Sequence, residues 1–94
     1  MDFEWDEEKA LANIRKHGVS FETASRIFLD PFRIEKHDEG HDDIEERWQS
    51  IGMTHMDVLM LVYTERGEDG TVIRIISARK ANEQERQTYY SLQA

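Results

Sequence analysis

The sequence contains no cysteine among its 94 residues. This absence excludes a disulfide framework, a thiol nucleophile and a zinc site built on thiolates. Long hydrophobic runs are also missing, since the longest, residues 58–63, is far shorter than the ~20 residues of a membrane-spanning helix. The opening residues, MDFEWDEEKA, carry acids where a signal peptide has bases and then an apolar stretch. We therefore expect a soluble, cytoplasmic protein with no membrane partner.

Positive charge is scarce overall, and its distribution is uneven. Residues 1–46 hold 14 acidic and 6 basic side chains, which gives −8, whereas residues 47–94 hold 6 of each and are neutral. A net charge of −8 disfavours nucleic-acid binding, which depends on neutralising phosphates. Five of the six bases in the second half are nevertheless arginines, whose planar fork of donors suits phosphate. This half can carry an anion site, although an ordinary charged surface explains the same composition.

The first third of the chain has the periodicity of helices. Asp6 is placed to cap a helix over residues 7–17, and Gly18 suits the position just past its end. Ser20 is placed to cap a second helix, which the Asp30–Pro31 pair ends.

After the single proline the apolar residues alternate, as in strands. The expected strands cover residues 32–35, 47–53, 56–64 and 71–79, with a polar loop at 36–46 and a glycine-containing hairpin turn at 65–70. Asn82 and Glu85 have the spacing of a capping box and open a C-terminal helix. We expect a single α+β domain over residues 1–94, with two N-terminal helices, a four-stranded antiparallel meander and a C-terminal helix. One face of this sheet can stay open.

Several segments resemble the BrnT toxin family. They are FEWDEEKALANIRKHGVSFETA at residues 3–24, EERW at 45–48, YTERG at 63–67 and VIRIISARKA at 72–81. The resemblance runs in order from Phe3 to about Tyr89. It implies a RelE-like fold and endoribonuclease activity without a metal or other cofactor. It also implies a BrnA-type antitoxin partner with a ribbon-helix-helix portion, through which alone DNA would be contacted. The one departure from the family's pattern that we note is the acidic first half of the chain.

Cleaving RNA without a metal needs a base for the 2′-hydroxyl proton, cations for the phosphorane and an acid for the leaving oxygen. Arg47, Arg74 and Arg79 are the candidate phosphate-binding catalytic residues. Arg74 is flanked by apolar residues within a strand, so its charge must be used in function or paired with an acid on a neighbouring strand. Glu46 and His17 are candidates for proton transfer. Arg47 with Glu46 can equally form a surface ion pair, and His17 can simply cap the end of a helix.

Further candidate RNA contacts are Lys16, Thr64, Arg66, Ser77 and Arg86. Alternation places Tyr63 in the core with Leu59 and Leu61, and places Thr64 on the opposite face with Met60 and Val62. On the C-terminal helix we expect Tyr89 to dock against the sheet.

The polar loop and the function class each leave an alternative. A divalent-ion site on the loop is conceivable, but its spacing matches no known ligand motif and we expect no metal there. The loop residues in question are His37, Asp38, His41, Asp42 and Asp43. The main rival function is a noncatalytic protein-interaction module that uses the same open sheet face. A nuclease relative that has lost its activity is a third reading.

Overall fold

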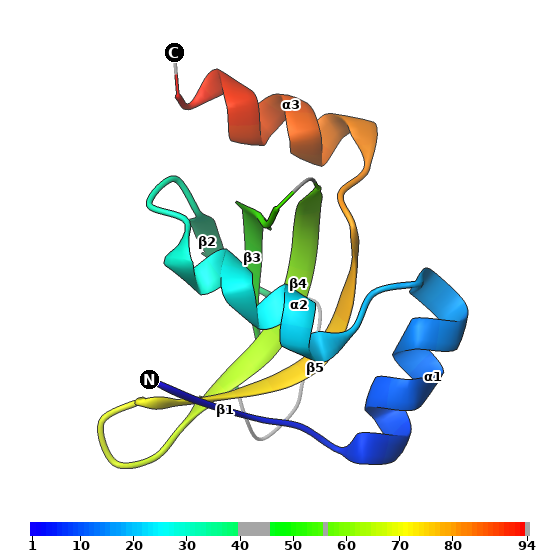
Figure 1. Cartoon of the computed structure of the whole chain (residues 1–94). Coiled ribbons are helices and arrows are strands. Elements are labelled where there is room, and N and C mark those ends of the chain that lie inside the picture. Colours follow the sequence, from blue (N-terminus) through cyan, green and yellow to red (C-terminus); the bar gives the residue numbers. More distant parts are fainter. Residues whose placement is uncertain (40–45, 56, 94) are drawn as a thin grey trace.

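The computed structural model describes residues 1–39, 46–55 and 57–93. Over these residues the chain forms an α+β fold with three α-helices, one 3-10 helix and a five-stranded mixed sheet (Figure 1). The strands lie in the order β1-β5-β4-β3-β2. The elements are β1 (Asp2–Glu4), α1 (Glu7–His17), α2 (Phe21–Ser25), η1 (Arg26–Leu29), β2 (Ile34–His37), β3 (Trp48–Met53), β4 (Val58–Arg66), β5 (Val72–Lys80) and α3 (Glu83–Ser91).

The predicted helix ends are confirmed where capping residues set them. The carboxylate of Asp6 accepts the backbone N–H of Lys9 at 3.1 Å, and Gly18 ends α1 in the left-handed region with φ of 71°. Asn82 and Glu85 form the reciprocal capping box of α3. The predicted second helix is instead two pieces, α2 and the 3-10 helix η1.

The sheet differs from the predicted four-stranded antiparallel meander. A fifth strand, β1, pairs in parallel with β5, so that Glu4 lies beside Arg74. The expected strand at 32–35 is also wrong by two residues, because the backbone N–H of Phe32 donates to Asp30 in a turn and β2 begins at Ile34. Part of the expected third strand, Met56, lies outside the described residues. The RelE-like arrangement stays a prediction.

Both faces of the sheet carry apolar side chains, and helices cover each face. Helices α1 and α2 pack on one face, around Leu59, Leu61 and Tyr63 of the central strand β4. Buried Asn13 fixes α1 to β5, since its amide donates to the Ala78 carbonyl at 2.8 Å and accepts the Ala78 N–H at 3.2 Å. Tyr63 therefore packs in the core as predicted.

The opposite face is covered by α3, but only at one end. Tyr89 of α3 is buried with Met60 and Val62 of β4, which confirms its predicted docking role. In Figure 1, α3 lies at the end of the sheet away from β1 and the β4–β5 hairpin. None of the helices in the described residues is long and apolar enough to span a membrane.

Asp30 holds α3 in place through hydrogen bonds to three segments. The hydroxyl of Tyr89 and the backbone N–H of Met53 both donate to its Oδ2 atom, the latter at 2.8 Å. The backbone N–H of Phe32 donates to its Oδ1 atom at 2.9 Å. Burial disfavours the charged carboxylate, but these hydrogen bonds outweigh burial and lower the pKa of Asp30 below 3.8. The ionised carboxylate thus joins α3, β3 and the turn before β2.

We predict that Asp30→Asn lowers the free energy of unfolding at pH 7 by about 1–3 kcal/mol, because hydrogen bonds to a charged acceptor are lost. A lowered folded-state pKa gives stability that is present above about pH 4 and is lost as the pH falls below it. Urea unfolding at pH 7 and at pH 3 should therefore show a difference between the two proteins that shrinks at pH 3. An equal difference at both values would contradict this role of the carboxylate.

Candidate active site

The part of the sheet that α3 leaves open carries a row of polar residues on β1, β5 and β4 and at the residue that precedes β3. Glu4 of β1 lies beside Arg74 of β5, and Arg74 lies opposite Thr64 of β4. Arg47 directly precedes Trp48, which pairs with Tyr63, so alternation puts Arg47 on the same face beside Thr64. We call these four residues, Arg47, Thr64, Arg74 and Glu4, the open row. Residues from both ends of the sequence thus meet on one surface.

Arg74 has the acidic partner that the sequence left open. Its Nη1 atom donates to Oε2 of Glu4 at 2.7 Å, and the two side chains are 33% and 41% exposed. This bond uses one guanidinium nitrogen, whereas the guanidinium offers five N–H donors. A partly exposed pair of this kind contributes at most ~1 kcal/mol to stability. Arg74 is thus oriented by Glu4 and still able to meet an anion.

Thr64 lies between the two arginines and is almost fully buried, with 4% exposure. Its hydroxyl oxygen has no hydrogen-bond partner among the residues that the structure describes. A buried polar group without a partner costs about 1–3 kcal/mol. The hydroxyl oxygen is itself buried, so a ligand oxygen between Arg47 and Arg74 can bond to it only when a neighbouring side chain moves aside.

Two further candidate contacts lie on the same face. Arg66 follows Thr64 by two residues on β4 and is exposed. Ser77 of β5 pairs with Val62, which is the residue of β4 that precedes Thr64 by two and points to the same face. The pairing of β4 with β5 shifts by one residue at this point. Val62 pairs with Ser77 but Tyr63 pairs with Ile75, so Ile76 is an extra residue on β5. Bulges of this kind often lie next to active sites, where they redirect a side chain.

Arg79 is also on this face, but its side chain forms an ion pair with Glu85 of α3. It lies opposite Met60, and its guanidinium donates to both carboxylate oxygens of Glu85, at 2.8 and 3.0 Å. The hydrogen bonds that Arg79 donates to Glu85 raise the pKa of Arg79 against the effect of burial. Its observed contacts join β5 to α3.

Other predicted site residues lie apart from the open row. Lys16 and His17 end α1, which packs on the opposite face of the sheet. Arg86 is exposed on α3, with its guanidinium 5.9 Å from the centre of the Tyr90 ring. Glu46 is exposed and directly precedes Arg47. The structure therefore gathers Arg47, Thr64, Arg66, Arg74 and Ser77 on one face, with Glu46 beside them in sequence.

The polar loop, on which we expected no metal site, is described only in part. His41, Asp42 and Asp43 lie outside the described residues. Within the described ranges, no group of three or more His, Asp or Glu side chains is placed to hold a metal ion.

Sequence reasoning missed a polar cluster on the face that α1 and α2 cover. Fully buried Ser50 and Tyr63 share a hydrogen bond of 2.7 Å, and Arg33 donates to Ser50 at 2.7 Å. The Tyr63 hydroxyl donates to Glu35. Burial, and then the bond to Glu35, raises the pKa of Tyr63, so its hydroxyl stays protonated. The cluster is internally satisfied and stabilises the β2 edge of the sheet.

The comparisons with known proteins agree with the resemblance noted in the sequence. Residues 5–85 match the family described as the ribonuclease toxin, BrnT, of a type II toxin–antitoxin system. The 1.1 Å crystal structure of the Brucella abortus ribonuclease toxin BrnT is similar, with a TM-score of 0.65 and 27% sequence identity. This similarity covers 88% of the present chain and 99% of the Brucella chain. No match was found among curated proteins. The chain therefore belongs to the BrnT family of ribonuclease toxins of type II toxin–antitoxin systems.

Proposed function

We propose that this toxin cleaves RNA at the open row, by attack of the 2′-hydroxyl on the adjacent phosphorus and without a metal ion. The observation that carries the proposal is the buried Thr64 hydroxyl, which lacks a partner among the described residues and lies between Arg47 and Arg74. Two arginine forks and one hydroxyl donor match the oxygens of a phosphodiester. The same groups suit the extra negative charge of the phosphorane.

Each residue of the face has a distinct role in this proposal. Arg47 and Arg74 bind the non-bridging phosphate oxygens, and Thr64 donates its hydroxyl proton to one of them. Glu46 takes the proton of the 2′-hydroxyl, whereas His17 ends α1 on the far face. This role requires the Glu46 side chain to turn toward Arg47, because strict alternation would point it to the other face; both residues precede β3. The new P–O2′ bond forms as the P–O5′ bond breaks, and the 5′-oxygen takes a proton from water. The products are a 2′,3′-cyclic phosphate and a 5′-hydroxyl end.

Arg66 and Ser77 extend the contact to neighbouring nucleotides in this proposal. Both are on the same face as Thr64. Arg66 follows Thr64 by two residues on β4, and Ser77 pairs with Val62, which precedes Thr64 by two residues. Their contacts to phosphate and sugar would position the RNA without reading its sequence.

The proposed inhibitory partner is a BrnA-type antitoxin with a ribbon-helix-helix portion. Membership of a type II toxin–antitoxin family supports an antitoxin partner. A net charge of −8 disfavours direct contact between this chain and DNA, so DNA would be bound through the antitoxin.

Metal independence is tested by incubating the purified toxin, free of antitoxin, with RNA in the presence of a chelator. We expect cleavage at the same rate with and without EDTA, and inhibition when the cognate antitoxin is added. Loss of cleavage in EDTA that magnesium restores would contradict the metal-free mechanism. Folded, stable toxin with no cleavage under either condition would instead support a noncatalytic interaction module.

The role of Arg74 is tested by Arg74→Lys, which keeps the charge and the possibility of pairing with Glu4 but loses the bidentate fork. We expect the cleavage rate to fall by about 10²-fold, which is typical for loss of one donor to a developing anion, with little change in melting temperature.

The matched control is Glu4→Gln, which removes the acidic partner and leaves the arginine in place. The Gln amide oxygen can still accept the hydrogen bond that orients Arg74, so if Arg74 binds phosphate this variant should lose much less activity than Arg74→Lys. A near-normal rate in Arg74→Lys together with a lowered melting temperature would show that Arg74 is structural.

A further inference from the structure

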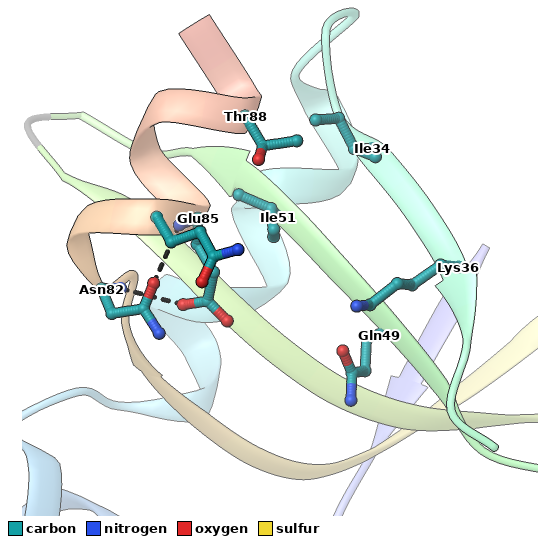
Figure 2. A pocket seen from close by; sticks show the side chains of 8 residues that line it. Ile34, Lys36, Gln49, Ile51, Asn82, Glu85 and Thr88 are labelled. Carbon is teal, nitrogen blue, oxygen red and sulfur yellow. Dashed lines mark hydrogen bonds between the residues drawn. The ribbon is translucent and has the colours of Figure 1, made fainter. Parts of the chain in front are cut away.

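A cavity of about 250 Å³ lies on the face of the open row, between α3 and the strands β2 and β3 (Figure 2). Ile34 and Ile51 form its apolar floor, and Lys36 and Gln49 line it from the strands. Asn82 and Glu85 line it from the first turn of α3. Figure 2 shows Lys36 and Gln49 on one side of this space and Glu85 on the other.

The cavity is next to the open row. Gln49 follows Arg47 by two residues on the same face, and it pairs with Val62, two residues before Thr64. Two residues along a strand span about 7 Å. A nucleotide bound with its phosphate at the open row would therefore place a neighbouring base within reach of Gln49.

The polar groups around the cavity include both hydrogen-bond donors and acceptors. Lys36 supplies an ammonium donor, and the Gln49 amide supplies a donor and an acceptor. Glu85 supplies a carboxylate, and its Oε2 atom accepts one bond from Arg79, at 3.0 Å. Burial opposes the charge on Glu85, but hydrogen bonds from Arg79 and Asn82 and the charges of Arg79 and Lys36 lower its pKa. The cavity thus has a cation and an anion on opposite sides of an apolar floor.

We propose that this cavity binds the nucleobase next to the scissile phosphate, with the ring against Ile34 and Ile51 and its edge read by Lys36, Gln49 and Glu85. This inference rests on the proposed cleavage at the open row. A volume of about 250 Å³ is below the ~300–1,000 Å³ of drug-sized ligand sites and suits a single base. Proteins read RNA sequence chiefly from unpaired bases that enter such pockets. The favoured base presents an acceptor to Lys36 and a donor to Glu85.

The experiment maps cleavage sites in an RNA pool of random sequence by sequencing the new ends. Wild-type toxin should prefer certain bases at one position next to the cleaved bond. Lys36→Met keeps the length of the side chain and removes its charge, and Gln49→Leu removes the amide. Each should reduce the base preference by about tenfold, the factor that one specific base contact provides. Lys9→Met, an exposed lysine of α1 on the opposite side of the sheet, is the matched control and should keep the wild-type preference.

The result that would overturn the inference is cleavage by wild type without base preference, or the same preference in both pocket variants. Either result would leave the proposed ribonuclease function intact. If wild type does not cleave RNA at all, the proposed function fails, and the pocket is tested by NMR titration with the four nucleoside monophosphates. Amide shifts at Gln49 and Thr88 that Lys36→Met abolishes would support the pocket, and no shifts there would refute it.

Discussion

The structure depends on covering the central strand β4 on both of its faces. Seven consecutive residues, Val58 to Thr64, are buried, so apolar side chains point to both sides of the sheet. Helices α1 and α2 cover one set, with Tyr63 at its end, and α3 covers the other set. The buried run ends at Thr64, where α3 no longer lies over the sheet. The candidate site lies at this point, where Arg74 and Glu4 are partly exposed beside the buried Thr64.

The extent of α3 also separates two arginines of β5, Arg79 and Arg74. Arg79 lies under α3, where its two hydrogen bonds to Glu85 hold the first turn of the helix on the sheet. Arg74 lies beyond α3, and its side chain donates to Glu4. Because Arg79 and Asp30 fix the two halves of α3, the helix also forms one wall of the cavity next to the open row. The anchoring of α3 thus shapes the surface that we propose for RNA.

Much of the local structure could be predicted from the sequence, because capping residues and alternation are local signals. Asp6, Gly18 and the Asn82–Glu85 pair set helix ends, and alternation assigned Thr64 to the correct face. Strand β1 could not be found this way, since three residues are too few to show a period and their partner is 70 positions away. Because β1 was not predicted, Glu4 could not be identified as the partner of Arg74. Periodicity also assigns a side chain to a face of its own element but does not say which elements share a surface, so His17 was grouped with arginines on the far side of the sheet.

We propose that the buried Thr64 hydroxyl, which has no partner among the described residues, binds phosphate. Thr64→Val replaces the hydroxyl with a methyl group of similar shape, and the most direct measurement is the RNA cleavage rate and melting temperature of this one variant. We expect opposite changes: the cleavage rate falls by roughly tenfold or more, while the melting temperature rises because a buried polar group with no described partner is removed. Cleavage at the wild-type rate, or a lower melting temperature, would contradict it.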